Sequence, residues 1–109
     1  MPDSPTTRTL KHLRDEGWLA QVVERWQPQA RRRIDLFGII DIVAIGKGRT
    51  LGVQATSGSN IVSRINKIKE SDALPILKES GWYLVVYGWR KLKSRPGGKL
   101  WHPDIRVIN

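Results

Sequence analysis

The sequence predicts an α/β domain whose central sheet contains both parallel and antiparallel strands. Two segments, residues 34–45 and 82–89, are continuously apolar, as in strands that are buried on both faces. A helical segment lies between the third and fourth expected strands, and such a crossover implies mixed pairing. The length of 109 residues suits one domain. We therefore expect an α-β-β-β-α-β core in residues 6–109, with room for an extra C-terminal strand, after a flexible N-terminus in residues 1–5.

The N-terminal part is expected to form a helix and then a strand. Thr6 or Thr7 can cap a helix that runs to about Glu16. Residues 21–26 are β-branched and aromatic, which favours a strand. A loop over residues 27–33 follows and ends in a run of three arginines.

The middle of the chain is expected to form a hairpin and a helix. Two glycines at residues 46–49 predict a turn, after which residues 50–56 return as the next strand. Ser59 or Asn60 can cap the following helix. That helix carries an apolar stripe for packing on the sheet, made of Ile61, Ile65 and Ile68.

The C-terminal part completes the predicted sheet. The helix is expected to bend near residues 72–75 and to end before the strand at residues 82–89. Residues 90–99 form an expected basic loop. Residues 100–108 can add an edge strand, although Pro103 favours an irregular or exposed segment.

The composition indicates a basic protein of the cytoplasm. Lys and Arg number 19 against 10 Asp and Glu, a net charge of +9 that attracts polyanions such as nucleic acid. A basic protein without a nucleic-acid role is the alternative. No apolar run is long enough to span a bilayer, and no signal-peptide segment precedes the first helix. The absence of cysteine excludes disulfides and thiolate catalysis. The modest core of so small a domain leaves a homodimer as an option.

Asp41 is the most unusual residue of the sequence, because it lies within the apolar segment 34–45. A buried and unpaired carboxylate costs several kcal/mol, so a partner is required. If the hairpin turns between Lys47 and Gly48, Asp41 faces Gln54 on the neighbouring strand. A carboxylate and an amide oxygen are ligands that hard divalent cations accept. A buried Asp–Gln hydrogen-bonded pair with a structural role is the alternative.

Three segments of the sequence together form a known pattern. The pattern is a carboxylate near a strand end, a short hairpin, an acid or amide, and a basic residue; its segments are residues 32–41, 53–57 and 64–68. This set resembles the PD-(D/E)XK nuclease superfamily, and in particular small phage and bacterial members near its Holliday-junction-resolvase-like and VRR-NUC branches. The resemblance covers residues 6–90.

The resemblance implies a restriction-endonuclease-like domain with Mg²⁺- or Mn²⁺-dependent endonuclease activity, on DNA rather than RNA. By this analogy Asp41 binds the metal, and Gln54 binds it through the amide oxygen at the position of the family's second acid. The carbonyl of Ala55 adds a ligand. Glu24 matches the extra acid that several members place before the motif.

The sequence also departs from the family pattern. Gln54 carries no charge, and Thr56 stands where the family has a lysine. Some members place that lysine on the following helix, so Lys67 is the candidate for this role and Arg64 for a phosphate clamp. A solvated helix face is the alternative for both.

The candidates for contact with nucleic acid are mainly arginines near the expected site. They are Arg31, Arg32, Arg33, Arg64 and Thr56. Asp35 is either a supporting acid or, in the preferred interpretation, an ion-pair partner of the three consecutive arginines. A second basic patch is expected at Lys91, Lys93 and Arg95. The rival function is a catalytically inert nucleic-acid-binding domain on the same fold. A basic protein associated with RNA or the ribosome, with a purely structural Asp41, is a third interpretation.

Overall fold

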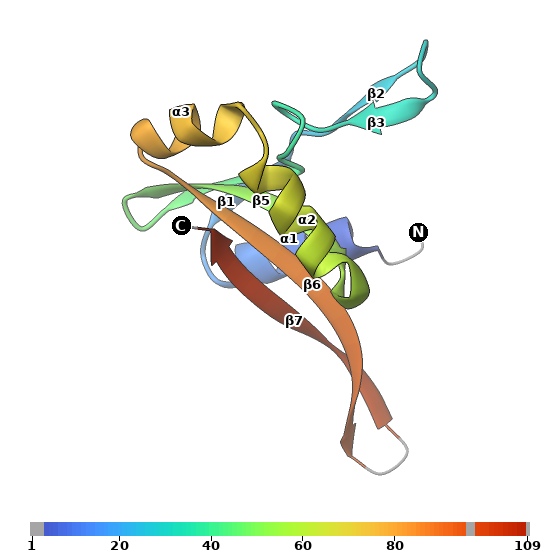
Figure 1. Cartoon of the computed structure of the whole chain (residues 1–109). Coiled ribbons are helices and arrows are strands. Elements are labelled where there is room, and N and C mark those ends of the chain that lie inside the picture. Colours follow the sequence, from blue (N-terminus) through green and yellow to red (C-terminus); the bar gives the residue numbers. More distant parts are fainter. Residues whose placement is uncertain (1–3, 96–97, 109) are drawn as a thin grey trace.

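Helices pack against a mixed β-sheet in this α/β fold, as a computed structural model describes it (Figure 1). The structure describes residues 4–95 and 98–108, with the side chains of 93–95, 98 and 99 left out. The elements follow in the order α1 (Pro5–Asp15), β1 (Leu19–Val22), β2 (Arg25–Gln27), β3 (Arg32–Ile34), β4 (Ile42–Gly46), β5 (Arg49–Ser57), a short 3-10 turn (Gly58–Asn60), α2 (Ile61–Lys69), α3 (Ala73–Glu79), β6 (Trp82–Arg95) and β7 (Gly98–Ile108).

The main sheet has the strand order β1-β4-β5-β6-β7. β1, β4 and β5 pair antiparallel, β5 pairs parallel with β6, and β6 pairs antiparallel with β7. Helices α2 and α3 make the crossover between the two parallel strands, as predicted. β6 and β7 form a long curved ribbon that extends away from the rest of the domain (Figure 1).

Helices cover both faces of the sheet. On one face Leu13 of α1 is in the same buried cluster as Ile42, Val53 and Val85. On the other face the isoleucine stripe of α2 packs as expected, with Ile61 and Ile68 buried and Ile65 partly buried; this cluster also contains Leu84 and Val86. A side chain at Gly88 of β6 would collide with Ile61, so a glycine there lets α2 approach the sheet.

The N-terminal helix starts earlier than the sequence predicted. Ser4 is the cap, and its Oγ accepts a hydrogen bond of 3.1 Å from the backbone N–H of Thr7. Pro5 takes the first helical position, where a missing N–H costs nothing. The expected cap at Thr6 or Thr7 is therefore wrong, and Pro5 is the first residue of α1.

The predicted single strand over residues 34–45 is wrong. β3 ends at Ile34, a turn follows, and β4 begins at Ile42. Within the turn Phe37 and Gly38 have φ of 54° and 76°, and the N–H of Gly38 donates to the carbonyl of Asp35. The run looked like a strand because Ile39 and Ile40 are buried, but they are buried in the turn.

The predicted strand over residues 21–26 is divided between two sheets. β1 is an edge of the main sheet, whereas β2 pairs with β3 in a separate two-stranded hairpin that stands away from it (Figure 1). The backbone N–H groups of Val23 and Glu24, between β1 and β2, donate to the carbonyl of Asp41 at 2.8 and 3.3 Å. The chain thus leaves the main sheet beside Asp41.

The basic loop expected at residues 90–99 is also wrong, because β6 continues to Arg95 and β7 begins at Gly98. Pro103 lies opposite Trp89 in β7. β7 is an edge strand, where a residue without an N–H is tolerated. Lys91 is exposed, and the side chains of Lys93 and Arg95 fall outside the described residues. None of the described helices has the length and apolarity needed to cross a membrane.

Candidate metal centre and its cleft

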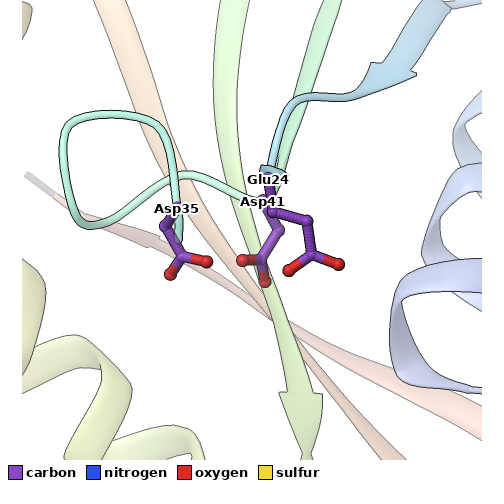
Figure 2. Close-up of side chains that lie close together, drawn as sticks. All are labelled: Glu24, Asp35 and Asp41. Atoms are coloured by element: carbon purple, nitrogen blue, oxygen red, sulfur yellow. The ribbon is translucent and has the colours of Figure 1, made fainter. Parts of the chain in front are cut away.

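Three carboxylates meet where the β2–β3 hairpin joins the main sheet. Glu24, Asp35 and Asp41 each offer an oxygen, and these oxygens all lie within 4.8 Å of one another. Figure 2 shows the three side chains directed to the same side of the chain segments that carry them. Asp35 directly follows β3 and Asp41 directly precedes β4, so the turn between them brings both carboxylates together.

Backbone hydrogen bonds fix the position of Asp41. Its N–H donates to the carbonyl of Val53 at 2.9 Å, and its Oδ2 accepts from the N–H of Ala55 at 2.9 Å. Both partners belong to β5, so the carboxylate is held against the strand that follows the hairpin. Asp41 is 5% exposed, which confirms that this acid is buried as the sequence indicated.

The environment of Asp41 favours its protonated form. Burial, a hydrogen bond with Asp35 and the charges of Asp35 and Glu24 raise the pKa of Asp41 to about 8, against the opposing effect of the Ala55 N–H. Asp41 therefore carries a proton at neutral pH when no cation is bound. That proton lies between two carboxyl groups, as expected for two acids that cannot both be charged at close range.

Asp35 is the charged partner in this pair. Burial alone would raise its pKa, but hydrogen bonds from Asp41 and Gln54 and the charge of Lys67 hold the pKa of Asp35 below its usual value. The Nζ of Lys67 lies 3.4 Å from the Oδ2 of Asp35. Burial and the nearby Asp35 raise the pKa of Glu24, and Arg33, at 4.0 Å, opposes that rise.

Gln54 is fully buried and has partners for both ends of its amide. The Nε2 donates to the Oδ2 of Asp35 and to the carbonyl of Ile39, both at 3.2 Å, and the Oε1 accepts from Arg64 at 3.1 Å. A reversed amide would set its oxygen against two acceptors and its nitrogen against a guanidinium. The hydrogen-bond network therefore directs the nitrogen of Gln54, not the oxygen, toward the carboxylates.

The predicted hairpin register is confirmed for the paired residues. Ile45 lies opposite Thr50, and the paired ladder extends to Ile42 opposite Val53. Asp41 and Gln54 lie one position beyond that ladder, and each is hydrogen bonded to Asp35. The expected convergence of the Asp41 carboxylate with the amide oxygen of Gln54 is not seen, because Gln54 turns its amide nitrogen to Asp35.

Asp35 is the site residue that the preferred interpretation of the sequence missed. The sequence favours an ion pair of Asp35 with Arg31–Arg33, but its described ion pair is with Lys67, and Arg33 contacts Glu24 instead. The signal that could have found it is Gly38, which marks a turn inside the apolar run and so folds Asp35 back onto Asp41.

Two other predicted site residues lie in β5, beside the cluster. Ala55 contributes its backbone N–H to Asp41, and the role of its carbonyl as a ligand stays a prediction. Thr56 is 4% exposed. This burial argues against the expected contact of Thr56 with nucleic acid.

A cleft of about 380 Å³ runs from the hairpin to helix α2, and Asp35 lies in its wall. Its lining combines four cations with one carboxylate: Arg32, Arg33, Ile34, Asp35, Gly38, Arg64 and Lys67. The cations come from β3 and α2, on two sides of the cleft. Arg31, the third predicted arginine, is exposed before β3. This charge pattern suits a phosphate backbone next to the carboxylates.

A second cavity, of about 400 Å³, lies between α1 and the ribbon of β6 and β7. Its lining includes His12, Trp89 and Trp101. Its carboxylate, Asp15, is bound to Lys11 by an ion pair of 2.7 Å. This cavity has the larger volume but no group of acids, so we place the candidate chemistry in the cleft beside Asp35.

The chemistry of the site suits a divalent metal ion next to a phosphate. Three carboxylate oxygens, one of them protonated without a cation, form a donor set that suits a hard divalent ion. A lysine and several arginines stand beside them. Comparisons of the chain with family models, with curated proteins and with solved structures found no match.

Proposed function

We propose that the protein is a Mg²⁺- or Mn²⁺-dependent nuclease that hydrolyses phosphodiester bonds, of DNA rather than RNA. One observation carries the proposal: Asp35 belongs both to the cluster of three carboxylates and to a cleft with four cationic side chains. Ligands for a metal and contacts for a phosphate backbone thus lie next to each other. The choice of DNA rests on the resemblance to PD-(D/E)XK nucleases.

Glu24, Asp35 and Asp41 are the residues that would hold the metal. Their oxygens are close enough together for a shared ion, and oxygen is the ligand that Mg²⁺ and Mn²⁺ prefer. A bound ion supplies Lewis-acid polarisation of the phosphate and a more acidic attacking water. Asp41 must release its proton to serve as a ligand, while Asp35 is already ionised.

Lys67 and Arg64 supply positive charge at the phosphate. Lys67 contacts Asp35 at 3.4 Å, so its ammonium stands at the edge of the carboxylate cluster. Phosphodiester hydrolysis builds negative charge on the phosphate oxygens, and a fixed cation lowers the energy of that state. Arg64 is oriented by Gln54 and lines the same cleft. Together they replace the charge that Thr56 cannot provide.

The architecture is consistent with the proposal. Helix α1, the antiparallel strands β1, β4 and β5, the crossover helices and the parallel strand β6 occur in the α-β-β-β-α-β order expected for a restriction-endonuclease-like core. The β2–β3 hairpin is then an addition between the first two strands of that core, and β7 is an addition at its end.

An inert nucleic-acid-binding domain is the second candidate, and the orientation of Gln54 favours it. The amide presents N–H groups rather than an oxygen to the carboxylates, so this position contributes no metal ligand. Asp35 compensates for the missing ligand, because it supplies a carboxylate to the cluster where Gln54 supplies none. Three acids remain without Gln54, and we therefore favour the nuclease.

Cleavage of supercoiled plasmid by the purified protein tests the proposal. We expect nicking in Mg²⁺ or Mn²⁺, none in EDTA, and none for Asp41→Asn purified in parallel. A matched control is Asp72→Asn, which alters an exposed carboxylate at the start of α3. Equal cleavage by the wild type and Asp41→Asn would point to a contaminating nuclease, and binding of DNA without any cleavage would support the inert domain.

A further inference from the structure

The β2–β3 hairpin carries an exposed tryptophan among arginines. Trp26 is 55% exposed and lies directly opposite Arg33 in the hairpin. The hairpin projects from the domain (Figure 1), and Trp26 belongs to neither of the buried hydrophobic clusters of the described residues. Residues 25–34 contain four arginines and no acidic residue. Such a segment attracts a polyanion and repels a basic surface.

The face of the hairpin that carries Trp26 also carries Arg33, which contacts Glu24 of the candidate metal centre. Side chains alternate along a strand, so Trp26 and its partner Arg33 share one face of the hairpin. Glu24 comes two residues before Trp26, and Asp35 two residues after Arg33. Arg33 contacts Glu24 at 4.0 Å, which ties this face to the carboxylate cluster. Arg33 and Asp35 both line the cleft.

An indole ring in this position has a use that a further arginine would not have. Phosphates are recognised by the arginines, whereas an exposed aromatic ring stacks on the flat face of a base. In a paired duplex each base face is covered by its neighbours, so the ring needs an unpaired nucleotide. A protein partner would be expected to need apolar residues around the tryptophan, but its cross-strand neighbour is Arg33.

We propose that Trp26 stacks on an unpaired base of a single-stranded segment whose phosphates lie in the cleft. This inference rests on the proposed function, because the strand it holds is the strand to be cut. The favoured substrate is then nucleic acid with a single-stranded segment at the site, in preference to a continuous duplex. Arg32 and Arg33, which line the cleft, contact the backbone of that segment, and Trp26 holds the adjacent base.

Fluorescence anisotropy in EDTA tests the proposal, since binding is then measured without cleavage. The probes are a labelled oligothymidylate and a labelled duplex of equal length. Loss of one base stack is expected to lower the affinity of Trp26→Ala for the single strand by at least about fivefold. The affinity for the duplex should change by less than about twofold, because the phosphate contacts remain. Trp26→Phe should keep most of the single-strand affinity.

The matched control is Trp101→Ala, which removes another exposed indole. Trp101 is 41% exposed on β7, in the ribbon that points away from the hairpin (Figure 1). It should leave the affinity for oligothymidylate unchanged within about twofold. If Trp26→Ala does not fold, Trp26→Leu keeps an apolar side chain in the strand without an aromatic face, and the same loss is expected.

The outcomes separate this inference from the proposed function. Wild-type binding to both probes with no selective loss in Trp26→Ala would overturn the stacking role and leave the nuclease proposal intact. An equal loss on both probes would also overturn it, because the tryptophan would then support the hairpin rather than a base. A selective loss for the single strand, together with no cleavage in Mn²⁺, would support the stacking role and overturn the nuclease.

Discussion

Replacing Asp41 by Asn is expected to stabilise the protein in the absence of metal. Asn has the same shape as a protonated Asp, so its Oδ1 can accept from the Ala55 N–H and its Nδ2 can donate to Asp35. The variant thus keeps both hydrogen bonds of the neutral acid. It loses only the free-energy cost of holding a proton that the unfolded chain would release.

The size of the effect follows from the pKa of Asp41, which burial and the neighbouring carboxyl groups raise from 3.8 to about 8. Between these values the native state binds a proton that the unfolded state does not, so the free energy of unfolding falls as the pH rises. One pKa unit corresponds to about 1.4 kcal/mol, which gives a cost of up to about 4 kcal/mol at pH 7. The lowered pKa of Asp35 makes the free energy of unfolding depend on pH only below its usual value of 3.8, which is outside the pH range considered for Asp41.

Urea unfolding in EDTA at several pH values measures this effect. We expect the free energy of unfolding of Asp41→Asn to exceed that of the wild type by at least about 2 kcal/mol at pH 7. This difference should widen from pH 5 to pH 8. The control Asp72→Asn should differ from the wild type by less than about 0.5 kcal/mol. A raised pKa of Asp41 is refuted if Asp41→Asn is less stable than the wild type at pH 7, or if the difference in stability is independent of pH.

Three further predictions concern the cations and the amide of the site. Lys67→Ala should lower turnover at least about a hundredfold with DNA affinity nearly unchanged, whereas the control Lys69→Ala, on the same helix, should cleave at the wild-type rate. Equal cleavage rates of Lys67→Ala and the wild type in single-turnover assays would exclude Lys67 from the chemistry. Gln54→Glu should lose the hydrogen-bond donors to Asp35 and Ile39, lower the free energy of unfolding by about 2–4 kcal/mol in EDTA, and gain more stability from Mn²⁺ than the wild type does. Thermal unfolding with and without Mn²⁺ tests this, and an equal gain in both proteins would contradict it. Replacing Arg31–Arg33 by Ala should lower the salt dependence of duplex binding by about 0.9 in slope for each phosphate that these arginines neutralise, as titrations at increasing salt would measure; an unchanged slope would mean that they do not touch phosphate.

The mixed sheet could be predicted because its signals are local. The glycine-containing turn at residues 46–49 sets the pairing of Ile45 with Thr50, and the helical stripe before β6 forces a crossover. The turn between β3 and β4 could not be separated from a strand, because an apolar run has the same appearance in either case. Ile40 is fully buried in that turn, so its burial reflects packing in the core and does not indicate a strand.

The candidate site was predictable in part, for a related physical reason. The sequence points to Asp41 because a carboxylate in an apolar run requires a partner, whereas only the resemblance points to Glu24 and Lys67. Asp35 joins the cluster only through the turn between β3 and β4, which the apolar run of the sequence conceals. The direction of the Gln54 amide depends on its hydrogen bond with Arg64. This bond joins a strand to a helix, so residue spacing within either segment does not predict it.

The most direct test of the metal centre is a crystal of the protein soaked in Mn²⁺ and measured near the manganese absorption edge. We expect an anomalous peak bounded by carboxylate oxygens of Glu24, Asp35 and Asp41, with the Gln54 amide still bound to Arg64. The same soak of Asp41→Asn crystals should give a much weaker peak or none. A wild-type crystal without a peak at these carboxylates, or with manganese bound only elsewhere, would contradict the account.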